Sequence, residues 1–442
     1  MSERLDDLAA DLAAGRTDPV RIVERALARA QASEAVFITL MADAALDEAQ
    51  AARRRWQEGS PLSPYDGIPI AWKDLFDIAG TRTSAGSRTR DGVEPATADA
   101  PVVAATRRLG FIALGKTNLS EFAFSGLGAN PHFGTPTADL PGEARMPGGS
   151  SSGSAVAVQR GIVPAAIGTD TAGSVRVPAA FTGCVGYKAS RGRYPMDGVF
   201  PLARSFDSLG PLAGSVADCV TMDAAMRGLL PRPLPAAELD LVVDDAILDD
   251  PAITAPVRAH IEAVLARLAG RARVSRRRVG AWHRVREAIL RLGWLGAYEA
   301  RQLHREMLNG PDRALVDPRV VSRLDGAAAI SAEAAAELAA IRAQEMPRLR
   351  AELGGATLVL PTVRHVAPLL APLEADPVRF AEVNVATLAL TLTASFLDMP
   401  GVALPTGRTE EGLPLSTLFC MTSGADDTLL ARAMAAEAVL LA

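Results

Sequence analysis

Residues 163–176 read V-P-A-A-I-G-T-D-T-A-G-S-V-R. The first eight residues are mostly apolar or small, which is typical of a buried strand, and the T-A-G-S that follows is typical of a tight turn. Gly173 and the small Ala172 allow the backbone to bring several N–H groups around one point. Such a group of donors suits an oxyanion, so the sequence predicts a strand that delivers Ser174 to an anion-binding turn.

Signals for strands and helices alternate on both sides of this stretch. Apolar segments typical of buried strands occur within residues 62–83, 97–122, 239–245, 356–362 and 400–407. Helical patterns occupy residues 1–58, 154–161, 211–229, 252–349 and the C-terminal end. Asp18 followed by Pro19 is typical of a helix start. Because strand signals lie on both sides of residues 252–349, we expect one α/β domain over residues 1–442, with its sheet interrupted by a helical layer.

The charge is nearly balanced, with 46 basic and 51 acidic residues and a net charge of −5. No basic face for nucleic acid stands out, no apolar run reaches the roughly 18 residues of a membrane span, and the acidic N-terminus lacks the features of a secretory signal. The three cysteines, Cys184, Cys219 and Cys420, have neither metal-binding nor disulfide spacing. We therefore expect a cytoplasmic protein that takes a small-molecule substrate, with a homodimer as one possible assembly.

Lysine is rare in this chain. Lys73, Lys116 and Lys188 are the only three, and the other 43 basic residues are arginine. Arginine cannot lose its proton in a protein, whereas a buried lysine can act as a neutral base. Lys73 follows the apolar I-P-I-A-W segment, so its surroundings favour the neutral amine. We expect structural roles for Lys116 and Lys188.

A second stretch rich in serine, P-G-G-S-S-S-G-S-A-V-A at 147–157, contains the G-x-S-x-G pattern around Ser151. In α/β-hydrolases this pattern follows a strand and works with a later acid and histidine. Here the preceding T-A-D-L-P-G-E-A-R-M-P is broken by prolines and charges, and the five histidines stand in no catalytic motif and are interpreted as surface or loop residues. A serine-histidine-acid triad around Ser151 is therefore disfavoured.

The chain resembles the amidase signature family of serine amide hydrolases. The resemblance rests on I-P-I-A-W-K-D, A-L-G-K-T-N-L-S-E-F, P-G-G-S-S-S-G-S-A and G-T-D-T-A-G-S-V-R-V-P-A-A, with weaker matches in S-L-G-P-L-A-G-S-V-A-D and P-G-V-A-L-P-T-G. It is dense over residues 62–222 and patchy afterwards. It implies a three-layer α/β/α fold around a large mixed β-sheet, with residues 252–349 and 123–146 shaping the acyl pocket. It implies neither a metal nor an organic cofactor.

The resemblance also implies a Ser-cisSer-Lys triad. Ser174 is the expected nucleophile, Ser150 is the bridging serine on a cis peptide bond 24 positions earlier, and Lys73 is the base. These residue types suit the chemistry, because a serine hydroxyl needs a base and a second hydroxyl can accept one proton while it donates another. Ser151 is then a structural neighbour.

By the same resemblance, the backbone N–H groups of Thr171, Ala172, Gly173 and Ser174 hold the oxyanion. The chain departs from the family at one of these positions, because most members have glycine where this chain has Ala172. Alanine keeps the N–H group but restricts φ, which would make the oxyanion site narrower.

Three further residues complete the implied site. Asp170 and Arg176 flank the nucleophile and are expected to clamp its turn, with direct substrate contact as the alternative. Ala123 falls where a backbone carbonyl of the family faces the leaving group.

The expected activity is hydrolysis of a carboxylic amide to an acid and ammonia or an amine through a serine acyl-enzyme. A ureido-acid amidohydrolase similar to allophanate hydrolase is an alternative that T-A-G-S slightly favours. A glutaminase subunit of a tRNA amidotransferase is another, but it would need a partner chain, and the weak similarity after residue 222 counts against it. Outside catalysis, the chain would be an inactive scaffold, which the three filled catalytic positions disfavour.

Overall fold

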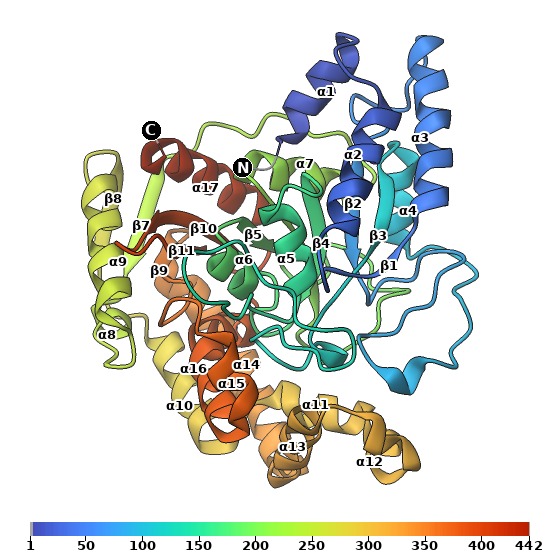
Figure 1. The fold of residues 1–442 in the computed structure, drawn as a ribbon. Coiled ribbons are helices and arrows are strands. Elements are labelled where there is room, and N and C mark those ends of the chain that lie inside the picture. The colour runs from blue at the N-terminus through green and yellow to red at the C-terminus, as the bar shows by residue number, and fades with distance from the viewer. Residues whose placement is uncertain (1–2, 442) are drawn as a thin grey trace.

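The structure, a computed structural model, describes residues 3–441 and is built around an 11-stranded mixed β-sheet (Figure 1). In sheet order the strands are β1 (Phe37–Leu40), β3 (Ile112–Thr117), β2 (Pro69–Lys73), β4 (Ala165–Asp170), β6 (Ser208–Ala213), β5 (Val185–Lys188), β10 (Gly401–Arg408), β11 (Pro414–Cys420), β9 (Thr357–Pro361), β7 (Leu239–Val243) and β8 (Ala272–Arg276). β2 runs parallel to β3 and β4, and β7 runs parallel to β8 and β9. The neighbours between these two groups pair antiparallel.

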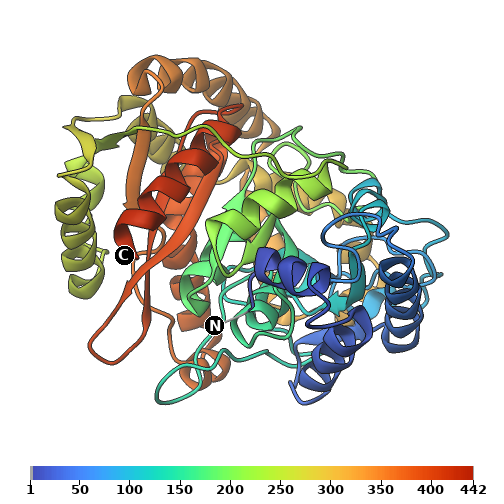
Figure 2. The ribbon, with the colours of Figure 1, turned by 90° about the horizontal axis from the view of Figure 1, so that it is seen from above.

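Helices cover both faces of the sheet. They are α1 (Leu5–Ala13), α2 (Pro19–Gln31), α3 (Ala42–Gln57), α4 (Pro101–Arg108), α5 (Ser152–Gln159), α6 (Arg176–Thr182), α7 (Val216–Met226), α8 (Asp245–Leu248), α9 (Ala255–Leu268), α10 (Gly280–Leu292), α11 (Leu295–Leu303), α12 (Arg305–Asn309), α13 (Pro318–Gly326), α14 (Ala332–Leu353), α15 (Leu370–Ala375), α16 (Pro377–Phe396) and α17 (Asp426–Leu440). α5 and α6 lie on one side of the sheet and α7 and α17 on the other (Figure 2). The expected α/β/α fold around a mixed sheet is confirmed.

The start of α2 forms as the sequence predicts. The side chain of Asp18 accepts hydrogen bonds from the N–H groups of Val20 and Arg21, and Pro19 occupies the first turn, where its missing N–H costs nothing. Val23 and Leu27 then recur at helical spacing and are buried.

Several strands were not expected. β1 and β8 lie inside segments whose sequence pattern predicts helices. Each strand is short and pairs with only one neighbour at an edge of the sheet, so it leaves little strand pattern in the sequence. β6 contains Pro211, which reads as a breaker since it cannot donate to a ladder. Pro211 is tolerated because β5 pairs with β6 only at Leu212 and Ala213, so no ladder bond to β5 is lost at the proline. On its other side, β6 pairs with β4 along its whole length.

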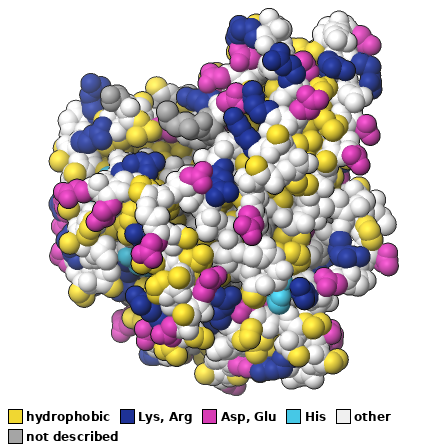
Figure 3. All heavy atoms as spheres, viewed as in Figure 1, with side chains coloured by type: hydrophobic (Ala, Val, Ile, Leu, Met, Phe, Trp, Pro, Cys, Tyr) yellow, Lys and Arg dark blue, Asp and Glu magenta, His cyan; other side chains and the backbone are white. Residues whose placement is uncertain are grey.

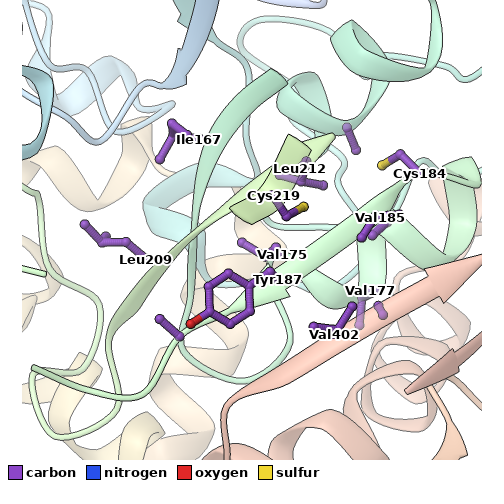
Figure 4. Close-up of a cluster of buried hydrophobic side chains, with 14 of the residues drawn as sticks. Ile167, Val175, Val177, Cys184, Val185, Tyr187, Leu209, Leu212, Cys219 and Val402 are labelled. Atoms are coloured by element: carbon purple, nitrogen blue, oxygen red, sulfur yellow. The ribbon is translucent and has the colours of Figure 1, made fainter. Parts of the chain in front are cut away.

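One continuous hydrophobic core extends through the molecule, from Leu5 to Leu440. Figure 4 shows its centre, where Ile167, Val185, Leu212 and Val402 gather from four adjacent strands. Within residues 3–441, no helix has the length and apolar character that crossing a membrane requires.

The helical segment expected over residues 252–349 forms α9 to α14, with β8 between α9 and α10. α10 to α13 gather below the sheet in Figure 1. Side-chain hydrogen bonds connect this helical segment to the rest of the molecule. Arg342 on α14 donates to the carbonyl of Phe396 at 2.8 Å and to that of Ser205 at 2.7 Å.

Leu212→Ala tests the importance of the central core. Leu212 is fully buried, so its truncation leaves a cavity and should lower the free energy of unfolding by about 2–5 kcal/mol. The matched control is Leu290→Ala, because Leu290 is 79% exposed and its truncation should change stability by less than about 0.5 kcal/mol. Denaturant titration of both variants measures the difference, and equal losses would contradict the placement of β6 at the centre of the core.

Candidate active site

Lys73 ends β2 with its side chain fully buried. Its Nζ lies 2.6 Å from Ser150 Oγ and 2.8 Å from Thr169 Oγ1, so both of its side-chain partners are hydroxyls. Burial lowers the pKa of Lys73 to about 7, because the ammonium form loses its hydration, and the negative charges of Asp170 and Asp207 oppose only part of this shift. Near neutral pH the amine can therefore both accept and release a proton.

Ser150 is held in place by the backbone around it. The Gly149–Ser150 peptide bond is cis, as the resemblance implies. The carbonyl of Ser150 accepts a hydrogen bond from the N–H of Ser120 at 3.2 Å, and the N–H of Gly149 donates to the carbonyl of Gly126 at 2.8 Å. These contacts fix the hydroxyl of Ser150 against Lys73.

Ser174 follows β4 in the turn that leads to α6. Its carbonyl accepts a hydrogen bond from the N–H of Ser151 at 3.2 Å, which ties the turn to the serine stretch that carries Ser150. The residue is 4% exposed, and its Oγ forms no hydrogen bond with another described residue. Its hydroxyl is thus not engaged elsewhere, and the contact from Ser150 to Ser174 stays a prediction.

Asp170 and Arg176 form a fully buried ion pair on either side of Ser174. Arg176 Nε and Nη2 donate to the two carboxylate oxygens of Asp170 at 2.9 and 2.8 Å. The carboxylate also accepts from the N–H groups of Gly173 at 2.7 Å and Val175 at 3.1 Å. The positive charge of Arg176 and these hydrogen bonds outweigh burial, so the pKa of Asp170 falls to about 2. The ion pair therefore joins the two ends of the turn that carries Ser174, and its role in catalysis stays a prediction.

The predicted oxyanion donors are not equivalent. The N–H groups of Thr171, Ala172 and Ser174 donate to no other described residue, whereas the N–H of Gly173 already donates to Asp170. The structure thus differs from the expectation at Gly173. Its role is instead steric: with φ at +135°, an added Cβ would lie 2.2 Å from Thr391 Oγ1. Ala172 adopts no positive φ, so alanine is accommodated there without strain.

Ala123 lies in the loop that faces the serine stretch. Both Phe122 and Ala123 have positive φ, at 52° and 59°. The N–H of Ala123 donates to the carbonyl of Ser120 at 2.8 Å, while its own carbonyl accepts from no other described residue. The carbonyl is therefore free to accept a further hydrogen bond, and its contact with a leaving group stays a prediction.

The other two lysines and Ser151 have structural contacts. Lys116 Nζ lies 2.6 Å from the carboxylate of Asp74, and Lys188 Nζ donates to the carbonyls of Ala189 and Met399. Ser151 Oγ donates to the carbonyl of Thr169 at 3.3 Å, and no strand lies between β3 and β4 to make it a nucleophile elbow. These residues match the structural roles expected of them.

The expectation for His304 was wrong. It lies just after α11 and is 6% exposed, with its ring 4.4 Å from the Phe122 ring. Burial and the nearby charge of Arg90 lower its pKa to about 4. The arginines around it in the sequence suggested a solvated surface, but the histidine side chain itself packs inward on this aromatic ring.

Sequence reasoning missed several residues that touch the site. Thr169 stands in the quoted motif, and its hydroxyl beside Lys73 follows from the parallel pairing of β2 with β4. Thr391 on α16 donates to the carbonyl of Ala172 at 2.7 Å, and Ser395 accepts from Arg176 at 2.7 Å. These α16 residues lie more than 200 positions along the chain, and no local pattern marked them.

The loop with Ala123 also contacts the helical segment. Glu121 accepts a hydrogen bond from the N–H of Asp317 at 2.6 Å. Arg323 on α13 stacks 4.4 Å from the centre of the Phe124 ring and donates to the carbonyl of Phe124. α13 therefore supports the loop that the resemblance assigns to the leaving group.

A family model described as Amidase matches residues 21–242. Among curated proteins, the chain is 44% identical over 227 residues to a glutamyl-tRNA(Gln) amidotransferase subunit of Ralstonia nicotianae. The aligned region covers 51% of this chain and 45% of that protein. It is 39% identical over 237 residues to the mandelamide hydrolase of Pseudomonas putida, with 52% and 46% covered. The matched region thus spans about half the length of these relatives.

A solved structure agrees over the whole fold. The crystal structure of an amidase superposes with a TM-score of 0.89 at 32% identity, and the match covers 99% of this chain and 100% of that one. The similarity thus extends beyond residue 242, into the part of the chain where sequence motifs are sparse.

The two adjacent serines provide a matched test of the site. Ser150 and Ser151 are both fully buried, but only Ser150 contacts Lys73. Ser150→Ala should slow the reaction of Ser174 with a serine-directed covalent probe by about 10²–10⁴-fold, the usual contribution of a proton-transfer group. Ser151→Ala should change the labelling rate little, because it removes one long hydrogen bond. A folded Ser151→Ala variant that fails to label would instead support the elbow interpretation.

Proposed function

Because this chain belongs to the amidase signature family, we propose that it hydrolyses a linear carboxylic amide through an acyl-enzyme on Ser174. The observation that carries the proposal is the buried amine of Lys73, with a pKa near 7, at 2.6 Å from the hydroxyl of Ser150. A lysine without a carboxylate partner in hydrogen-bond contact is a costly feature for a purely structural role. It is a suitable one for a general base near neutral pH.

In the acylation step, Ser174 Oγ attacks the amide carbon while its proton passes through Ser150 to neutral Lys73. The developing oxyanion accepts hydrogen bonds from the free N–H groups of Thr171, Ala172 and Ser174. The ion pair of Asp170 and Arg176 holds this turn in shape before the substrate arrives, so little reorganisation is needed during the reaction.

Collapse of the tetrahedral intermediate breaks the C–N bond. Protonated Lys73 returns the proton through Ser150 to the leaving nitrogen, which the carbonyl of Ala123 orients. Water then attacks the acyl-enzyme with the same proton path, and the acid leaves. The residues themselves supply the nucleophile, the base and the oxyanion donors, and we propose no metal or organic cofactor.

A second candidate is the glutaminase component of an amidotransferase. The 44% identity to the amidotransferase protein of Ralstonia nicotianae favours it. Such a component would use the same acyl-enzyme chemistry, but it would hydrolyse glutamine and depend on a partner chain. A ureido-acid amidohydrolase remains within the same chemistry, and the inactive scaffold is the non-catalytic alternative.

We further propose a single-domain cytoplasmic enzyme with a small-molecule substrate. The continuous core supports one domain, and the three buried, unpaired cysteines are compatible with a reducing compartment. Figure 3 shows basic and acidic side chains mixed over the displayed face, which gives nucleic acid no extended basic surface.

The pH dependence tests the role of Lys73. The base must be neutral, and burial lowers its pKa to about 7, so kcat/KM should rise with pH up to about 7 and level off above it. Lys73→Ala should lose about 10²–10⁴-fold in acylation rate and keep its fold, as judged by circular dichroism. A rate that climbs only toward pH 10, or wild-type acylation in Lys73→Ala, would rule out the assignment.

Ammonia release separates the candidate functions. Purified chain should release ammonia from a panel of aliphatic, aryl and ureido primary amides, and Ser174→Ala should abolish the release because the acyl-enzyme cannot form. Release from glutamine alone, and only with added partner, would indicate the amidotransferase component. A folded chain that neither releases ammonia nor labels at Ser174 would be a scaffold.

A further inference from the structure

A buried ion pair lies beside the base but takes no part in the proposed proton path. Asp74 directly follows Lys73 and is fully buried, and Lys116 Nζ lies 2.6 Å from its Oδ1. The same amine donates to the carbonyl of Arg82 at 2.8 Å and to Thr83 Oγ1 at 2.9 Å. All three donors of the ammonium are thereby used. Lys116 therefore connects the loop that carries Arg82 and Thr83 to the carboxylate of Asp74.

The other oxygen of this carboxylate holds the next residues of the same loop. It accepts hydrogen bonds from the N–H of Ser84 at 3.1 Å and from Ser84 Oγ. Ser84 Oγ in turn accepts from the N–H of Gly86 at 3.1 Å. The backbone carbonyl of Asp74 accepts from the N–H of Ala85, also at 3.1 Å. Asp74 and Ser84 together therefore fix the backbone of Ala85 on both of its sides.

Ala85 connects this network to the loop that carries Ala123. The carbonyl of Ala85 accepts a hydrogen bond from the N–H of Phe122 at 2.9 Å, and Ala123 is the next residue. All three residues are buried. A hydrogen bond shielded from water is electrostatically stronger than an exposed one. The position of Ala85 therefore determines where the backbone of Ala123 begins.

The backbone is strained at each of these three residues. Ala85, Phe122 and Ala123 have φ of 53°, 52° and 59°, in the left-handed region that residues other than glycine rarely adopt. Such conformations cost free energy, persist where the surrounding contacts enforce them, and are concentrated at active sites. The contacts that begin at Asp74 thus enforce a conformation that these residues would rarely adopt alone.

We propose that Asp74 is a positioning residue, which acts through Ser84 to direct the carbonyl of Ala123 at the nitrogen of the leaving group. The inference rests on the proposed amide hydrolysis and adds to it a residue outside the nucleophile, the base and the oxyanion donors. Because Asp74 directly follows Lys73, the base and the acceptor of the leaving nitrogen are held from the same point of the chain.

The test compares an amide and an ester that share one acyl group. The leaving nitrogen of the amide carries an N–H that can donate to the carbonyl of Ala123, whereas the leaving oxygen of the ester has no such hydrogen. Ser84→Ala removes the hydroxyl that joins Asp74 to the N–H of Gly86. It should lower kcat/KM for the amide relative to the ester by about tenfold, the worth of one hydrogen bond.

Ser63→Ala is the matched control. Ser63 and Ser84 are both 6% exposed. The Oγ of Ser63 likewise accepts from the N–H two residues later, that of Tyr65, and donates to another segment, at the carbonyl of Leu109. These contacts lie before β2 and not after it, so Ser63→Ala should keep the wild-type ratio of amide to ester hydrolysis.

Asp74→Asn tests the same connection from the carboxylate. It keeps an oxygen for the N–H of Ser84 but removes the charge that pairs with Lys116, so the ratio should change in the same direction. Thermal melting checks that each variant is folded, and either Ser84→Ala or Asp74→Asn decides the question if the other does not fold.

The outcomes separate this inference from the proposed function. A wild-type ratio in folded Ser84→Ala, whether both rates fall or neither does, would overturn the inference and leave the amide hydrolysis standing. A tenfold change in Ser63→Ala would overturn it as well, because the ratio would then follow stability. If the wild type hydrolyses the ester but no amide, the proposed function fails, and the inference fails with it.

Discussion

The burial of one amine at the end of a central strand is the constraint on which the rest of the site depends. Lys73 and Lys116 lie on the neighbouring strands β2 and β3 and both are buried, yet Lys116 has the carboxylate of Asp74 as a partner and Lys73 has only hydroxyls. An ammonium without a counter-ion loses more on burial than a paired one. Burial lowers the pKa of both amines, but at Lys116 the direct contact with Asp74 opposes the shift, and Lys73 has no such contact.

The carboxylate of Asp170 has a structural role in the site. Asp170 turns its carboxylate toward Arg176 and two backbone N–H groups, so the turn around Ser174 is held by a buried ion pair. Burial lowers the pKa of Lys73 by more than the charge of Asp170 raises it. The arrangement allows an acid to organise the nucleophile's turn without making its base permanently cationic.

The sequence predicts those parts of the molecule whose structure is determined by residues adjacent in the chain. β2 and β4 are apolar segments that run directly into Lys73 and Asp170, and a strand followed by a glycine turn has few other interpretations. The edge strands β1 and β8 were missed because four or five residues with one partner carry little pattern. Thr391 and Ser395 were missed for another reason: their roles come from the packing of α16 on the distant turn around Ser174, and a single sequence holds no sign of that contact.

This division has a consequence for how the site recognises substrates. The residues that carry out bond chemistry lie on β2, β4 and the serine stretch, which are fixed by the sheet and by the Asp170 ion pair. The loop with Ala123 is fixed differently, since its contacts come from α13, α16 and the aromatic ring of Phe122 against His304. A substitution in α13 can therefore move this loop and the groups that face the substrate, whereas α16 also holds the turn around Ser174 through Thr391 and Ser395. The contacts that support recognition and those that support chemistry therefore meet at α16 and in the hydrogen bonds of the loop with Gly149 and Ser150.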